Sequence, residues 1–157
     1  LPITIRDLIK TALRMRPNRV IVGECRGAEA LDVLQAMNTG HDGSLSTGHA
    51  NSCKDMLSRL ETMVLMGMEL PLPAIRSQIA SGIDFLIHLG RMRDKSRKVL
   101  SITEIAGYEE NQIILNDIYR FKEEKAEENT VHGAMEKVGE LIHTEKMIRA
   151  GYCLDGL

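Results

Sequence analysis

Residues 14–27 read RMRPNRVIVGECRG, and this stretch decides the fold. The run from Arg19 to Gly23 is short and apolar, which is typical of a strand buried on both faces in a parallel sheet. Pro17 ends the element before it, because proline cannot continue a helix. Glu24 follows the strand directly, and ligands of open α/β sheets bind beyond the carboxyl ends of the parallel strands. The stretch therefore predicts a parallel strand with a carboxylate placed for chemistry.

Helices and a second strand are predicted around this strand. Apolar residues from Thr4 to Arg16 recur at three- and four-residue steps, with Thr4 as the cap and Asp7 in the first turn, so this segment is a predicted amphipathic helix. A second helix is expected at about 28–38, a second strand at about 44–49 and a third helix at about 52–66. This order favours an α/β fold, with a right-handed unit around a mostly parallel sheet.

The chain after about residue 82 predicts a different arrangement. A helix is expected around 74–81, and three segments of strand character follow it without intervening helices, at 85–89, 99–105 and 113–118. Because the turns between them are short and polar, we expect an antiparallel strand extension.

The last quarter of the chain, roughly, is expected to lie outside this domain. We divide the sequence into a domain at 1–121, a charged linker at 122–133 and a terminal helical segment at 134–157. The helix is predicted from about Ala134 to Ala150, weakened by roughly 1 kcal/mol at Gly139.

Composition narrows the function classes. The chain has 157 residues, of which 43% are hydrophobic, enough to bury a core. The formal net charge of -2 gives no basic field for nucleic acid, and aromatic residues are too few, at 3%, for base-stacking platforms. No apolar run reaches the roughly 20 residues that span a bilayer, so we expect a cytosolic chain. Three scattered cysteines without a C-x-x-C pair predict reduced thiols.

Two interpretations of Glu24 follow from its position. A carboxylate at a strand end can hold magnesium through water or orient an attacking water. Alternatively, Glu24 pairs with Arg26 or caps the helix that opens at Gly27. The residues leave both interpretations open.

The histidines and arginines nearby also allow more than one role. His41 and His49 flank a glycine- and hydroxyl-rich stretch that could sense a γ-phosphate, although a lone histidine near a strand end is more often a structural residue. A zinc site from His41, His49, Cys25 and Cys53 matches no common metal pattern, and the serines lack a G-x-S-x-G elbow. Arginines suit phosphate clamping or helix-surface solvation, and the sequence offers Arg6, Arg14, Arg16, Arg19 and Arg26.

Two motifs carry a resemblance to a known family. Residues 14–27 resemble the Walker B region of the type II/type IV secretion ATPase superfamily, and GHDGSLSTGHAN at 40–51 resembles its His box. The sequence around the His box is most similar to that of the Tad/Flp pilus-assembly branch, with QAMNTGHDGS before it and SRLETMVLM after it. The likeness runs from about Ile3 to Tyr119.

This resemblance implies the carboxyl-terminal portion of a RecA-like P-loop NTPase motor domain. Such a motor works as a hexameric ring, is peripheral to the inner face of the cytoplasmic membrane, and uses ATP and Mg²⁺ to power pilus assembly or secretion. The implied partners are further copies of itself and an inner-membrane platform protein, with no direct nucleic acid. Glu24 would be the Walker B acid, near magnesium through water, and His49 its catalytic companion. His41, Arg6, Arg14 and Arg16 would contact the nucleotide.

One expected motif is missing from these residues. No G-x-x-x-x-G-K-[ST] occurs, so nothing here supplies the backbone amides and lysine that cradle phosphates. We therefore expect a motor fragment that is inactive alone. The alternatives are a non-catalytic truncated interaction module of the secretion machinery and a metal-dependent hydrolase.

Overall fold

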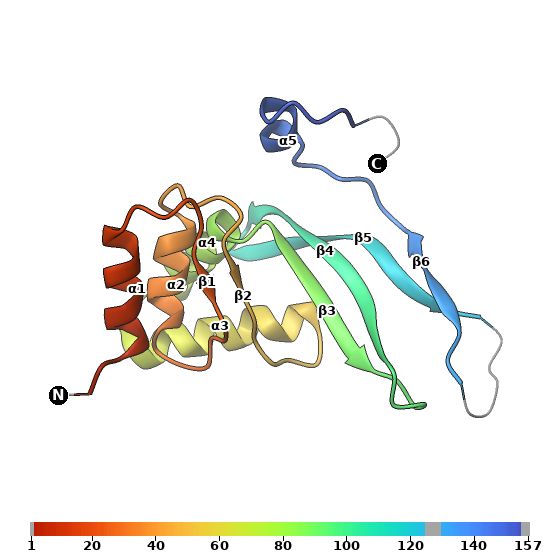
Figure 1. Cartoon of the computed structure of the whole chain (residues 1–157), viewed down its shortest axis with the longest axis horizontal. Helices are drawn as coiled ribbons and strands as arrows, with labels where there is room; N and C mark the ends of the chain where they lie inside the picture. The colour runs from red at the N-terminus through yellow and green to blue at the C-terminus, as the bar shows by residue number, and fades with distance from the viewer. Residues whose placement is uncertain (1, 125–129, 155–157) are drawn as a thin grey trace. The chain divides into compact units, whose positions relative to one another are not determined.

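The computed structural model describes residues 2–124 and 130–154. The chain divides into two compact units, residues 1–83 with 108–113 and residues 84–107 with 114–157 (Figure 1). The first unit contains four helices and two short strands among its described residues: α1 (Ile5–Arg14), β1 (Ile21–Val22), α2 (Ala30–Met37), β2 (Leu45–Ser46), α3 (Cys53–Gly67) and α4 (Leu72–Gly82). Its elements follow the predicted α/β order.

The first helix begins as predicted. The Thr4 hydroxyl accepts a hydrogen bond from the Asp7 N–H, and the Asp7 carboxylate accepts from the Thr4 N–H, forming a capping box. Arg6 on α1 pairs with the buried Asp32 on α2, with 2.7 Å between Nε and Oδ2. Capping and this ion pair fix α1 against α2.

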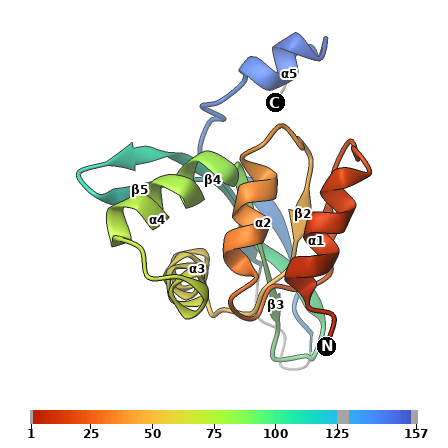
Figure 2. The same cartoon turned by 90° about the vertical axis from the view of Figure 1, so that its left-hand side faces the viewer.

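The core of the first unit lies around α2. This helix packs against α1, α3 and α4, which Figure 2 shows on either side of it. Leu34, Ile75 and Ile79 are almost fully buried, at 1%, 0% and 0% exposure. Fully burying side chains of this size stabilises a fold by about 1.5–3 kcal/mol each, so the helices hold the unit together.

The two strands pair in parallel but are shorter than expected. The register joins Ile21 to Leu45 and Val22 to Ser46. The prediction that the strand is buried on both faces is wrong, because Ile21 is 68% exposed and Leu45 is 60% exposed. The helices cover the face that bears Val20, and the described residues place no second layer over Ile21.

The second unit is an antiparallel sheet with the order β3-β4-β5-β6. Its described elements are β3 (Phe85–Arg91), β4 (Arg97–Glu109), β5 (Gln112–Glu123), β6 (Gly133–Lys137) and α5 (Glu145–Arg149). Glu110 and Asn111 form a two-residue turn between β4 and β5, with φ of 47° and 64°. The predicted antiparallel extension is therefore confirmed.

The predicted helix from Ala134 to Ala150 is wrong. Residues 133–137 form β6, which pairs with β5, and only Glu145–Arg149 is helical. The free edge of β5 offers backbone hydrogen bonds that outweigh the helix propensity of this segment. Gly133 permits the close approach, because a Cβ there would lie 2.3 Å from the Lys122 carbonyl oxygen. Of the predicted linker, Lys122 and Glu123 belong to β5, and 125–129 lie outside the described residues.

A buried carboxylate ties the chain after β6 to the sheet. Glu104 on β4 is 1% exposed and accepts hydrogen bonds from the N–H groups of Ile142 and His143, at 2.9 and 2.7 Å. The Asn116 side chain donates to the same carboxylate at 3.1 Å. Burial raises the pKa of Glu104, but these donors outweigh burial and hold it below the ordinary value. Glu104 is thus an ionised anchor for residues 142 and 143.

A second carboxylate with a low pKa, Asp94, lies in the turn between β3 and β4. Its pKa leads us to predict that acid destabilises the fold. Hydrogen bonds from the Ser96 side chain and backbone lower the pKa of Asp94 to about 2, and the Val131 N–H adds to the effect. The stabilisation is present above the unfolded pKa of about 3.9 and is lost as pH falls through about 2. We expect the free energy of unfolding to decrease over this window. Chemical denaturation at stepped pH should show that the free energy of unfolding falls less steeply with decreasing pH in Asp94→Asn than in the native chain. The same dependence on pH in both proteins would contradict this role.

Candidate functional site

Glu24 and His49 lie together beyond the carboxyl ends of β1 and β2. Glu24 Oε1 is 2.8 Å from His49 Nε2. Two further hydrogen bonds join the segments that follow β1 and β2. The Thr47 hydroxyl donates to the Gly23 carbonyl at 2.6 Å, and the Cys25 N–H donates to the Thr47 carbonyl at 2.9 Å. The structure thus brings together the two residues that the sequence placed at these strand ends.

The Glu24 carboxylate is held between the side chains of Arg26 and His49. Arg26 pairs with Oε2 and His49 with Oε1. The Arg26 guanidinium lowers the pKa of Glu24 below its ordinary value against the opposing effect of burial, and His49 lowers it further. Oε1 is buried, and His49 satisfies it only when Nε2 carries a hydrogen. At neutral pH the site therefore contains a carboxylate that accepts hydrogen bonds.

A second glutamate fixes the turn that carries Arg26. Glu29 Oε1 accepts hydrogen bonds from the N–H groups of Arg26 and Gly27, at 2.7 and 3.1 Å. Cys25 within this turn is buried, and burial raises the pKa of its thiol to about 11. A protonated thiol is a poor metal ligand. Among the described residues, no three histidine, cysteine, aspartate or glutamate side chains converge on a possible metal position.

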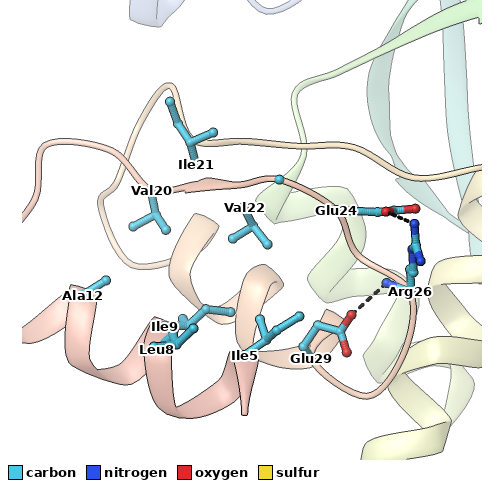
Figure 3. A pocket seen from close by; sticks show the side chains of 11 residues that line it. Ile5, Leu8, Ile9, Ala12, Val20, Ile21, Val22, Glu24, Arg26 and Glu29 are labelled. Carbon is cyan, nitrogen blue, oxygen red and sulfur yellow. Dashed lines mark hydrogen bonds and ion pairs between the residues drawn. The ribbon is translucent and has the colours of Figure 1, made fainter. Parts of the chain in front are cut away.

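A groove of about 600 Å³ runs along β1 beside α1 and ends at this turn (Figure 3). Figure 3 shows Val20 and Val22 pointing toward α1 and Ile21 pointing away. The groove has an apolar wall and a charged end, where its lining includes Glu24, Arg26 and Glu29. The charged residues of the turn thus lie at one end of an otherwise apolar groove.

The other predicted contact residues lie elsewhere in the first unit. His41 Nδ1 is 3.1 Å from the Ala36 carbonyl oxygen, and His41 precedes β2, whereas His49 follows it. Arg14 and Arg16 are exposed where α1 ends, before β1 begins. Because β1 and β2 are parallel, their amino ends lie opposite the edge occupied by Glu24. Arg6 is engaged by Asp32. The structure therefore does not bring His41, Arg14 or Arg16 to the Glu24–His49 pair.

Sequence reasoning did not anticipate the role of Glu29. An available signal was its position, three residues after Arg26 and immediately before α2, where a carboxylate can accept from unpaired N–H groups. The pairing of Arg26 with Glu24 was foreseen only as the structural alternative to chemistry. The structure contains that pair and the contact with His49 simultaneously.

Comparison with known proteins identifies the chain's relatives. The family described as "Type II/IV secretion system protein" matches residues 1–150. The chain belongs to this family. This chain is also 36% identical over 104 residues to the conjugal transfer protein TrbB of Rhizobium radiobacter, covering 66% of this chain and 31% of that protein. It is 37% identical over 91 residues to the type IV secretion system protein VirB11 of Brucella suis, covering 56% and 25%.

A solved structure supports the same assignment for the fold. The VirB11 ATPase from the Brucella suis type IV secretion system, crystallised in complex with sulphate, matches this chain with a TM-score of 0.62 and 33% identity. The match covers 66% of this chain and 32% of that one. This chain therefore spans less than a third of the length of these relatives. No helix within residues 2–124 and 130–154 has the length and apolar character needed to cross a membrane.

Proposed function

We propose that this chain forms part of a hexameric ATPase that hydrolyses ATP to power pilus assembly or protein secretion across the bacterial envelope. The observation that carries the proposal is the ionised Glu24, held against His49 at the carboxyl ends of two parallel strands. Family membership and the likeness to a VirB11 ATPase give the proposal its reaction class. The sequence around the motif at residues 40–51 favours the Tad/Flp pilus-assembly branch.

Glu24 has the chemistry that this reaction requires of a Walker B acid. Its carboxylate is ionised and about a quarter exposed, so it fits the outer coordination sphere of magnesium and can orient an attacking water. Mg²⁺ bound with ATP would supply charge neutralisation at the phosphates. His49, with its side chain 81% exposed, is accessible to the terminal phosphate.

The remaining parts of the motor are proposed for the longer protein. These 157 residues contain no G-x-x-x-x-G-K-[ST] motif, so we assign the phosphate cradle to sequence outside them. The ring of like subunits, the inner-membrane platform partner and the location at the cytoplasmic face of the membrane belong to the same proposal. Arg6, Arg14, Arg16 and His41 remain candidate nucleotide contacts only if a neighbouring subunit brings a nucleotide to them.

A non-catalytic interaction module is the second candidate. The exposed apolar side chains of Ile21 and Leu45, side by side on β1 and β2, favour a surface that binds another protein segment. Under this alternative, the chain retains the contact surface of the family without turnover.

Turnover and binding measurements separate the two candidates. ATP hydrolysis and equilibrium binding of a fluorescent ATP analogue are measured for the 157-residue chain and for the full reading frame that encodes it. We expect hydrolysis only from the longer protein and little binding by the chain alone, because phosphate recognition is incomplete here. Absence of hydrolysis by both proteins, under conditions in which the longer one assembles, would favour the interaction module.

A further inference from the structure

Each oxygen of the Glu24 carboxylate has its own side-chain partner. Arg26 contacts Oε2, and His49 Nε2 lies 2.8 Å from Oε1. A carboxylate with a single partner can rotate about its last torsion, whereas two partners on opposite oxygens define one orientation. The orientation of Glu24 therefore depends on Arg26 as well as on His49.

The backbone beneath Arg26 is also fixed. Its N–H donates to Glu29 at 2.7 Å, and the next N–H, from Gly27, donates to the same oxygen. Glu29 thus binds the backbone of the turn, which leaves the guanidinium of Arg26 to Glu24. The Arg26 side chain is 74% exposed, so its position is set by these contacts and not by packing.

We propose that Arg26 is a positioning residue for the Glu24–His49 pair, an inference that rests on the proposed ATPase function. Its guanidinium holds Oε2 so that Oε1 stays turned toward His49 Nε2. Because an ionised carboxylate only accepts hydrogen bonds, His49 must carry its hydrogen on Nε2 when the ring is neutral. Nδ1 is then an acceptor for a water or for a donor on an incoming ligand. Arg26 thereby determines both the direction of the carboxylate and the tautomer of the histidine.

The first test uses the 157-residue chain and requires no ATP. Carboxyl ¹³C and imidazole ¹⁵N shifts of Glu24 and His49 are followed by NMR against pH in the native chain, Arg26→Gln and Arg26→Lys. The titratable groups that face Glu24 are Arg26 and His49, so removing Arg26 leaves His49 as its one side-chain partner among the described residues. We expect Arg26→Gln to raise the Glu24 titration midpoint and to reduce the preference for hydrogen on Nε2. Arg26→Lys should retain part of both effects.

Arg59→Gln is the matched control. Arg59 is exposed on α3 and has no ion-pair partner among the described residues. Arg59→Gln removes one positive charge, as Arg26→Gln does, but from a residue that is not an ion-pair partner of Glu24. The Glu24 and His49 titrations should therefore follow those of the native chain. If Arg26→Gln also leaves both titrations unchanged while the spectrum shows a folded chain, Arg26 does not position Glu24.

The second test uses the full-length protein and separates this inference from the proposed function. We expect Arg26→Gln to lower kcat by about tenfold and to change the KM for ATP by less than about twofold. The acid limb of the profile of kcat against pH should move to higher pH. Arg26→Lys should restore part of kcat. If Glu24→Gln abolishes turnover while Arg26→Gln changes neither kcat nor the profile, the ATPase stands and the positioning role fails. If Glu24→Gln leaves turnover intact, the catalytic role of Glu24 fails, whereas absence of turnover in the native full-length protein overturns the proposed function. In both cases the NMR titration still decides the role of Arg26.

Discussion

Replacing Glu24 by glutamine is expected to reduce ATP turnover by the full-length protein at least about a hundredfold. The substitution keeps the size of the side chain and removes the charge that accepts from Arg26 and His49. A neutral amide cannot neutralise magnesium or take up a proton from an attacking water, so kcat falls while nucleotide affinity changes little. Single-turnover hydrolysis, with parallel binding measurements, checks both halves of this expectation.

Glu69→Gln provides the control for this experiment. Glu69 is exposed in the loop between α3 and α4. Its replacement by glutamine removes one negative charge from the same unit as Glu24. Turnover by this variant should stay within about twofold of the native rate, since surface substitutions away from a site have small effects. Equal losses in the two variants would mean that the Glu24 effect reflects net charge and not the site.

The second large effect is on stability, at Glu104. We expect Glu104→Ala to lower the free energy of unfolding by about 2–4 kcal/mol, because it removes a buried acceptor of charge-assisted hydrogen bonds. The N–H groups of Ile142 and His143 would lose their partner, as would the Asn116 amide. Urea denaturation followed by circular dichroism measures the change, and amide exchange at residues 142 and 143 locates it.

Two further variants make this prediction sharper. Glu104→Gln keeps an acceptor oxygen but places an NH₂ group against a backbone donor, so an intermediate loss is expected. Glu109→Ala, an exposed glutamate on the same strand, should change the unfolding free energy by no more than about 0.5 kcal/mol. A loss below about 1 kcal/mol for Glu104→Ala would show that water replaces the carboxylate without cost.

The parts of the fold that the sequence predicted are those set by local chemistry. The capping box of Thr4 and Asp7 is encoded within four residues, and the order of the first helices and strands follows from apolar spacing and turn residues. Glu24 and His49 could be placed at one edge because parallel strands share the direction of their carboxyl ends. No long-range contact had to be known for these predictions.

The features that were missed depend on partners distant in sequence. The donors to Glu104 lie 38 and 39 residues further along the chain, and no local pattern marks them. Residues 133–137, GAMEK, favour a helix by propensity and become a strand only because β5 offers a free edge. The exposure of Ile21 was missed for a similar reason, since an apolar run indicates burial without saying which layers are present.

The shortness of β1 and β2 has a consequence for ligand binding. Only two residues of each strand pair, and beyond them the two segments are joined by the hydrogen bonds from the Thr47 hydroxyl to Gly23 and from the Cys25 N–H to Thr47. We therefore expect the backbone that leads to Glu24 and His49 to open more easily than the helices of the same unit. A ligand that grips both side chains must first restrict this motion, and part of its binding free energy goes into ordering the two strand ends. Affinity at this edge therefore depends on strand rigidity as much as on the groups that touch the ligand, and any contact that lengthens the pairing would tighten binding without approaching the ligand.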